Sequence, residues 1–189
     1  MAVILALETA TTNCSVAVVD SKGEVFLKED YGSKYSHGES LHVFIEELLT
    51  EAGISKDELQ AVAVSAGPGS YTGLRIGVSA AKGLCFALGK PLIAISTLEA
   101  LAHQVKTEEG IIIPMLDARR LEVYASVFDH KHDEVRAIEA EILNENSFET
   151  YLNLGEVHFI GNGVSKTREL ITHSNATFVE DKLPSAREM

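Results

Sequence analysis

An internal repeat is the feature that most constrains the fold of this chain. Residues 7–24 (LETATTNCSVAVVDSKGE) align without gaps on residues 116–133 (LDARRLEVYASVFDHKHD). Each copy has an apolar strand that ends in Leu and an acid, then a polar turn, then a second strand that ends in Asp. Self-similarity at a fixed offset indicates a duplicated architecture. We therefore predict an α/β fold with two related halves, at residues 1–105 and 106–189, each built on a mixed sheet, with the second half smaller.

The remaining apolar runs and turn signals agree with two such halves. Short apolar runs bounded by Gly, Pro, Asn and Asp are typical of strands, and apolar residues three and four apart are typical of helices. Ser-x-x-Glu at residues 55–58 and 96–99 predicts two helix starts. We expect residues 183–189 to be the start of a helix that is cut short. The predicted strands are 2–7, 14–20, 24–29, 61–66, 91–95, 111–116, 122–128, 157–160 and 177–179, and the main helices are 36–52, 72–88, 96–105 and 163–172.

Composition and charge exclude several classes of protein. Apolar residues make up 46% of the 189 residues, enough for a substantial core, but no apolar run is long enough to span a bilayer. The N-terminal sequence has no basic start and no small-residue cleavage site, so we expect a cytoplasmic protein without a signal peptide. The net charge of −12 opposes a phosphate backbone, so the chain should not hold RNA by itself. Its two cysteines, Cys14 and Cys85, are expected to be buried, reduced thiols.

A glycine-rich stretch at residues 65–83, SAGPGSYTGLRIGVSAAKG, is superficially similar to a phosphate-binding loop. A P-loop has four residues between its glycines and then Lys and Ser or Thr. Here five residues separate Gly67 from Gly73, and Leu74-Arg75 follows. The dinucleotide fingerprint G-x-G-x-x-G also fails by one position. A phosphate cradle is therefore the weaker of two interpretations.

The stronger interpretation is a helix that is packed on nearly all sides. Residues 72–88 are apolar or small almost all round, and Arg75 and Lys82 carry their only charges. Such a helix must be covered nearly all round. Glycine inside a helix costs about 1 kcal/mol relative to alanine, so close packing must offset it. We predict that the small residues let another helix approach closely, and that part of the cover comes from another chain.

Two acids, Glu8 and Asp117, end the equivalent strands of the two halves. If they face each other they could hold Mg²⁺ through water, and a stand-alone ATP-dependent phosphotransferase is the alternative function that this leaves open. In the other interpretation each acid caps its own turn. The turns argue against an ATP site, because ETATTN lacks glycine and DARRLE fills the space of a phosphate with two arginines and a leucine.

The histidines predict neither a metal site nor a catalytic set. Of the seven, His37 and His42 are five positions apart, so they do not share a helical face as His-x-x-x-His would. No Ser/His/Asp set and no Cys/His pair can be assembled with any specificity. The residues therefore predict no catalytic group, no metal and no cofactor.

Five segments of the chain resemble, in order, the characteristic blocks of the bacterial TsaB (YeaZ) family. The match covers nearly the whole chain, and GPGSYTGLRIG is its most specific block. The resemblance implies a duplicated actin-like and sugar-kinase-like (RNase H-like) fold, which agrees with the internal repeat. The matching segments are ILALETATTNCSVAV, SHGESLHVFIEELL, SAGPGSYTGLRIGVSAAKGL, STLEALA and LDARRLEVYASVF.

The resemblance also implies a function. Members of the family partner the related catalytic subunit TsaD and the small ATPase TsaE. Together these proteins transfer threonylcarbamoyl from its adenylate to adenosine 37 of tRNAs that read codons beginning with A. The chain would then be an essential, non-catalytic subunit that meets tRNA only through the complex and needs no cofactor and no membrane. TsaD uses His-x-x-x-His for metal, and this chain lacks that motif, which disfavours the metallopeptidase that the broader relationship suggests.

The resemblance further implies which surface binds the partner. In the family, the helices that match residues 36–52 and 72–88 form a bundle with the same pair from TsaD, or from a second copy in a homodimer. At Glu8 the family usually has Asp, so the longer acid weakens any Mg²⁺ role, and relatives continue beyond LPSAREM with another helix. The implied interface residues are Leu41, Phe44, Ile45, Leu48, Gly73, Arg75, Gly77, Ala80, Lys82, Leu84 and Ala87; the vestigial nucleotide-site positions are Glu8, Asp117, Arg119, Gly161 and Gly163.

Overall fold

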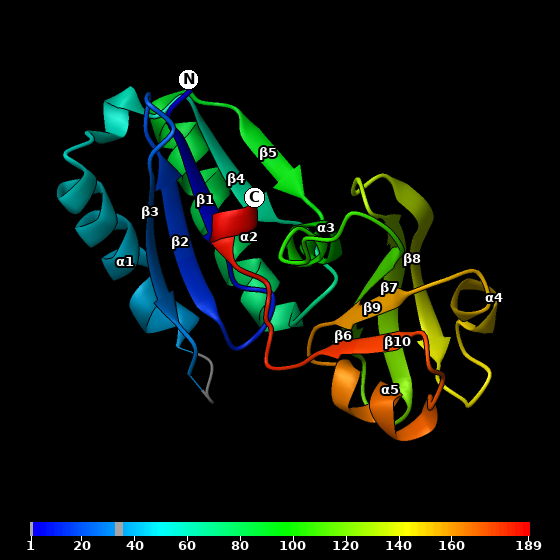
Figure 1. Cartoon of the computed structure of the whole chain (residues 1–189). Helices are drawn as coiled ribbons and strands as arrows, with labels where there is room; N and C mark the ends of the chain where they lie inside the picture. Colours follow the sequence, from blue (N-terminus) through cyan, green and yellow to red (C-terminus); the bar gives the residue numbers. More distant parts are fainter. Residues whose placement is uncertain (1, 33–35) are drawn as a thin grey trace. The chain divides into compact units, whose positions relative to one another are not determined.

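The chain folds into two compact units, and the computed structural model describes residues 2–32 and 36–189 (Figure 1). The first unit comprises Met1–Ala100 together with Pro184–Met189, and the second comprises Leu101–Leu183. This division differs from the two expected halves because the end of the chain belongs to the first unit. There Ala186 is buried against alanines of the first sheet, and its N–H donates to Ser15 Oγ (2.7 Å).

The first unit contains a five-stranded mixed sheet with the order β3-β2-β1-β4-β5. The first three strands form an antiparallel meander, and β4 and β5 extend it in parallel from β1. Parallel pairing of this kind requires long crossovers, which the helices supply. The strands are β1 (Ile4–Glu8), β2 (Cys14–Val19), β3 (Val25–Asp30), β4 (Ala61–Ser65) and β5 (Leu92–Ile95).

Two long helices, α1 (His37–Ala52) and α2 (Tyr71–Leu88), bury their apolar sides in one core with alternate residues of this sheet. Each ends at a glycine in the left-handed region, Gly53 (φ 64°) and Gly89 (φ 63°), where a residue without Cβ is favoured. The short turn η1 (Lys56–Glu58) carries the predicted capping box, and α3 (Thr97–Ala102) ends three residues earlier than expected. In Figure 1 the C-terminal turn η2 (Ala186–Glu188) lies on the sheet face opposite α2.

The second unit repeats the path of the first sheet. Its strand order, read as β8-β7-β6-β9-β10, places each strand where its counterpart stands in β3-β2-β1-β4-β5. The strands are β6 (Ile111–Asp117), β7 (Glu122–Asp129), β8 (Glu134–Ile142), β9 (Val157–Ile160) and β10 (Ala176–Val179). Its helices, α4 (Glu149–Leu152) and α5 (Val164–Leu170), are much shorter than α1 and α2.

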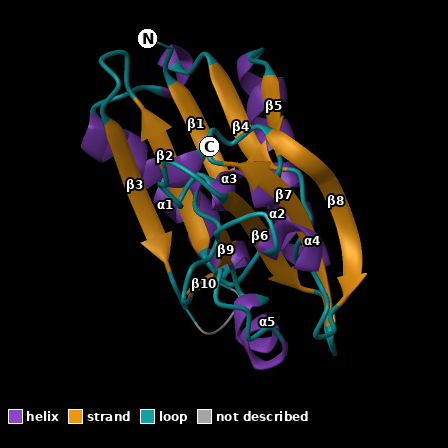
Figure 2. Cartoon of the chain, turned by 45° about the vertical axis from the view of Figure 1, so that its right-hand side comes forward, coloured by secondary structure: helices purple, strands orange, loops and turns teal. Residues whose placement is uncertain are grey.

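The predicted fold class, a duplicated α/β fold with mixed sheets, is confirmed by this shared strand order. The β8 strand is longer than the short segment expected after β7, and Figure 2 shows it as the long outer strand of its sheet. Within the described residues no helix combines the length and apolar character that a bilayer crossing requires. Cys14 and Cys85 are free and buried, and burial raises the pKa of the Cys14 thiol to about 11.

Candidate functional site

The glycine-rich stretch places the start of α2 directly on the turn that follows β1. A Cβ added at Gly73 would lie 2.1 Å from the backbone oxygen of Thr9, and one added at Gly77 would lie 2.3 Å from the Thr9 hydroxyl. Real Cβ contacts are not this short, so only glycine fits against the Thr9 backbone at Gly73, and a Cβ at Gly77 would require the Thr9 hydroxyl to move. The N–H of Ser70, the N-cap residue of α2, donates to the Ala10 carbonyl (2.6 Å), and the Thr9 hydroxyl donates to the Gly73 carbonyl (2.8 Å).

This geometry corrects the physical reason that we expected for the small residues. Gly73 and Gly77 are buried against the chain's own Thr9, not against a helix of another molecule. The same contact disfavours a phosphate cradle, because Thr9 and Ala10 occupy the space beside the glycines. Gly69, Gly73 and Gly77 therefore serve close packing, as predicted, but their packing partner is the β1–β2 turn.

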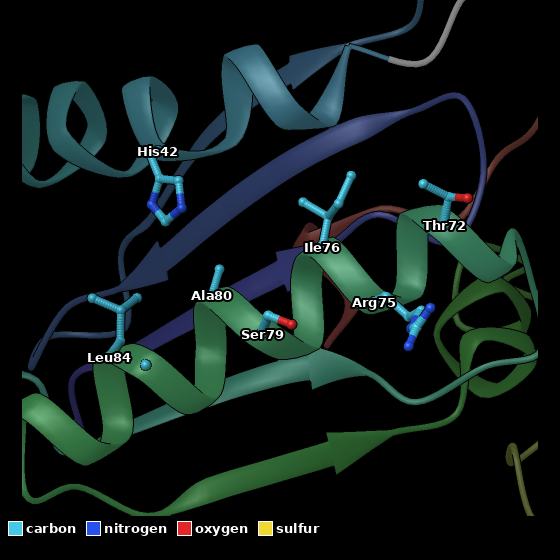
Figure 3. A pocket seen from close by; sticks show the side chains of 8 residues that line it. His42, Thr72, Arg75, Ile76, Ser79, Ala80 and Leu84 are labelled. Carbon is cyan, nitrogen blue, oxygen red and sulfur yellow. The ribbon is translucent and has the colours of Figure 1, made fainter.

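A groove of about 810 Å³ lies between α1 and α2 on the outer side of the first unit (Figure 3). Figure 3 shows His42 on α1 pointing toward α2, with Ile76, Ala80 and Leu84 on the side of α2 that faces it. Thr72, Arg75, Ser79 and Gly83 complete the lining. Apart from the backbone of α2 itself, no atom of the described residues lies within 4 Å of a Cβ built at Gly83, so the groove is open there.

Only part of the implied interface set lies at this groove. Arg75, Ala80 and Leu84 line it, and Lys82 and Ala87 are exposed on α2. By contrast, Leu41, Ile45 and Leu48 are buried in the chain's own core, and Phe44 is partly buried against that core. Their burial corrects the expected membership of the surface, because a side chain inside the core cannot contact a partner.

Sequence reasoning missed His42, Thr72, Ile76, Ser79 and Gly83 as groove residues. A signal for four of them was available, because positions 72, 76, 79 and 83 follow one another at helical spacing. The spacing alone does not distinguish a groove from a solvent-facing side, because polar residues and glycine such as Thr72, Ser79 and Gly83 are typical of both.

The rest of the α1 and α2 surface is rich in exposed apolar residues and is unevenly charged. Phe86 is 93% exposed and Tyr71 is 73% exposed, and the Arg75 guanidinium lies over the Tyr71 ring at 4.9 Å from its centroid. Arg75 and Lys82 are the charges of α2, which contains no acid. On α1, Glu39 is exposed, and the exposed Glu46 and Glu47 are paired with Lys56 and Lys28. Exposed aromatic rings beside arginine are typical of protein–protein interfaces.

Glu8 is fully buried at the end of β1 and is already hydrogen-bonded within the chain. Its Oε1 accepts from the Ala10 N–H (2.5 Å), and its Oε2 contacts the Ser65 hydroxyl. Burial raises the pKa of the Glu8 carboxyl to about 7, against the lowering effect of these hydrogen bonds. A carboxyl in this position has no open side for a hydrated ion.

Asp117, the equivalent acid of the second unit, is exposed and is held by a cation of its own unit. Its Oδ1 accepts from Lys166 Nζ (2.7 Å) and from the Arg119 N–H (2.6 Å). Although partial burial raises the pKa of Asp117, the hydrogen bond and charge of Lys166 hold it below its usual value. Lys166 also donates to the carbonyls of Arg120 and Glu122, so it braces the whole turn.

Of the remaining vestigial positions, Gly161 and Gly163 have packing roles and Arg119 does not. Arg119 is exposed in the left-handed region (φ 76°). A Cβ at Gly161 would lie 2.2 Å from the Met115 carbonyl oxygen, and Gly163 packs against the Met115 side chain. Because Gly161 and Gly163 lack a side chain, strand β6 can approach them closely, as Thr9 approaches Gly73 and Gly77. Within the described residues, no group of three or more His, Cys, Asp or Glu side chains could hold a metal ion.

Comparison with known proteins places this fold and this glycine stretch in one family. Residues 32–187 match the family model described as TsaD: tRNA N6-adenosine threonylcarbamoyltransferase. The tRNA threonylcarbamoyladenosine biosynthesis protein TsaB of Bacillus subtilis is 34% identical over 129 residues, which are 68% of this chain and 56% of that protein. The chain belongs to the TsaB/YeaZ family. It spans little more than half of the length of this Bacillus subtilis TsaB.

Two further relatives extend the TsaB/YeaZ match to the whole chain. The Escherichia coli protein of the same name is 29% identical, with 98% of this chain and 83% of that protein covered. The solved structure of YeaZ from Pseudomonas aeruginosa superposes with a TM-score of 0.84 at 27% identity and covers 100% of this chain and 88% of that chain. The family predicted from the sequence blocks is therefore confirmed, and the fold of the chain is that of YeaZ.

Proposed function

We propose that this chain is a non-catalytic subunit of the complex that forms N6-threonylcarbamoyladenosine in tRNA, and that it docks a TsaD-type catalytic subunit through the α1–α2 groove. The modified base would be adenosine 37 of tRNAs that read codons beginning with A. The printed names of its TsaB relatives support the biosynthetic role. The observation that carries the docking proposal is the open groove beside exposed aromatic residues.

The uneven charge of the two helices supports a partner built from a similar helix pair. If a related pair packs against this one about a two-fold axis, α1 of each subunit faces α2 of the other. Arg75 and Lys82 of α2 then face a helix that carries the exposed Glu39, so the surface suits both a TsaD-type subunit and a second copy of this chain. Complementary charge of this kind favours correct pairing more than it adds affinity.

The strand-end acids support a non-catalytic role. Glu8 has no solvent exposure and is hydrogen-bonded to its own turn, while Asp117 is paired with Lys166. Neither carboxylate is free to hold a nucleotide-bound Mg²⁺ in this arrangement. A TsaE-type ATPase would supply the ATP chemistry of the complex, and tRNA would be held by the other subunits.

Reconstitution tests the proposal directly. The chain is mixed with a purified TsaD-type subunit, and the complex is sized by gel filtration with light scattering. Threonylcarbamoyl transfer to tRNA is then measured with each component omitted in turn. We expect a defined complex and transfer only when both subunits are present. Transfer by the TsaD-type subunit alone at the full rate, or by this chain alone, would contradict the proposal.

A further inference from the structure

We propose that the buried Glu8 carboxyl is a proton-sensitive latch that seats the first turns of α2, and with them one end of the α1–α2 groove. Glu8 stands at the end of β1, and the two residues that follow it form the platform on which α2 rests. A change in the state of this carboxyl therefore has a short structural path to the helix.

The first link runs through the backbone of Ala10. Glu8 Oε1 accepts from the Ala10 N–H (2.5 Å), and the Ala10 carbonyl accepts from the N–H of Ser70, the N-cap residue of α2 (2.6 Å). One peptide unit thus donates to the carboxyl on one side and accepts from the helix start on the other. If Ala10 rotates to follow Glu8, the Ser70 contact is lost.

The second link runs through Thr9. Its hydroxyl donates to the Gly73 carbonyl (2.8 Å), and its backbone and side chain leave no room for a Cβ at Gly73 or Gly77. Contacts this close transmit small displacements, because the packed atoms cannot be compressed. Thr72 and Ile76, neighbours of the two glycines on α2, line the groove.

The two protonation states of Glu8 differ in how well the site accommodates them. The neutral carboxyl can donate through Oε2 to the Ser65 hydroxyl of β4 while Oε1 accepts from Ala10. The ionised carboxylate is stabilised by the Ser65 hydroxyl and by the backbone N–H groups of Ala10 and Thr9, but it has no solvent, and burial opposes the charge more strongly. The pKa of Glu8, raised to about 7, places the change of state near neutral pH.

Among the described residues, the elements packed against this turn carry several other titratable or charged groups, including Arg187 and Glu188 of η2, which packs against β1 and β2. On β2, the Cys14 thiol, whose pKa is raised by burial, then by Asp30 on β3 and by Glu8, stays neutral up to pH 9. On α1, His37 Nε2 contacts the Thr11 carbonyl (2.7 Å), and burial holds its pKa below 6.5. The α2 residues that contact this turn are Ser70, Gly73 and Gly77, which carry no charge. Of Glu8, Cys14 and His37, Glu8 is therefore the one whose pKa lies between 6.5 and 8.

Hydrogen exchange of the free chain tests the latch. Protection factors of amides in residues 71–78 are measured at pH 6 and pH 8, after correction for intrinsic exchange. If opening exposes Glu8, its pKa falls from about 7 toward its ordinary value, and protection should drop roughly tenfold between these pH values. In Glu8→Gln, which mimics the neutral carboxyl, the drop should vanish.

Two further variants keep the test decisive. Ser65→Ala removes a donor to the carboxylate, so the loss of amide protection should extend to higher pH. This variant provides the test if Glu8→Gln does not fold. Asp117→Asn changes the equivalent acid of the second unit and should keep the wild-type drop. A Glu8→Gln or Ser65→Ala protein with the wild-type pH response would overturn the proposal. Any effect of the latch on docking rests on the proposed function and is measured separately. Failure of the latch therefore does not imply failure of the docking proposal, and the reverse also holds.

Discussion

Thr9 lies directly beneath Gly73 of α2, with its hydroxyl 2.8 Å from the Gly73 carbonyl and its backbone oxygen 2.1 Å from the place that a Cβ would take. The turn after β1 and the glycine-rich start of α2 are therefore one packing unit. This unit closes the side of α2 that faces the sheet and leaves the other side to the groove. The two sides of the helix can be tested separately.

Gly73→Ala should destabilise the chain, because the new methyl group must displace the backbone of Thr9. Overpacking of this kind typically lowers the free energy of unfolding by about 1–3 kcal/mol. Because the neighbour here is rigid backbone, we expect a loss of about 3 kcal/mol. Gly83→Ala is the matched control on the same helix, since nothing lies within 4 Å of its Cβ. It should gain roughly 0.5–1 kcal/mol from helix propensity. Urea unfolding measures both, and equal effects would show that Thr9 does not restrict Gly73.

Gly83→Trp should block the groove without disturbing the core. The indole would project from the open position on α2 into the space that we assign to the partner. A clash of about 1–3 kcal/mol would weaken association with the TsaD-type subunit roughly five- to 150-fold. Calorimetric titration measures the affinity.

The control for this variant is Gly155→Trp, a position in the second unit that also has nothing within 4 Å. Both proteins should show wild-type circular dichroism and melting. If Gly83→Trp binds the partner as tightly as Gly155→Trp does, the docking surface lies elsewhere on the chain.

The isolated chain should not hydrolyse ATP at a useful rate. Glu8 is buried, Asp117 is tied to Lys166, and the DARRLE turn is filled by side chains. Steady-state phosphate release with Mg-ATP measures this. Turnover that disappears in the Glu8→Ala, Asp117→Ala double variant would instead establish the phosphotransferase alternative.

Transfer RNA should bind the isolated chain weakly or not at all, because a net charge of −12 opposes a polyanion. A gel shift at physiological salt measures the affinity, with the reconstituted complex as the positive control. Submicromolar binding by the chain alone would show a local basic surface strong enough to overcome its overall charge.

The free energy of unfolding should fall as pH rises from about 4.5 to 7. Over this range the unfolded chain releases the Glu8 proton, whose ordinary pKa is 4.5, while the folded chain keeps it until about pH 7. The contribution of neutral Glu8 to the free energy of unfolding is therefore complete at acid pH and is lost by about pH 7, a total of roughly 3 kcal/mol. Denaturant unfolding at several pH values measures the slope. Glu8→Gln should remove this component, and a slope that is unchanged in this variant would assign it to other groups.

The sequence by itself determined the duplication and most of the elements. The helix predicted at 72–88 is observed at Tyr71–Leu88, and the repeat led to two sheets with one strand order. Periodicity and turn residues are local signals, so they can be interpreted without knowing which other segments pack against them. The family came separately, from the resemblance of five sequence blocks, of which GPGSYTGLRIG is the most specific.

Tertiary structure alone decided what each surface meets. Periodicity marked Leu41, Ile45 and Leu48 as one apolar face, but only the fold shows that the chain's own sheet buries that face. Gly73 needed a close neighbour, and that neighbour proved to be Thr9, which is 64 positions away in the sequence. The residue pattern of one helix or strand indicates that one of its sides is buried. Which atoms bury that side depends on long-range packing, and a local sequence pattern carries no information about it.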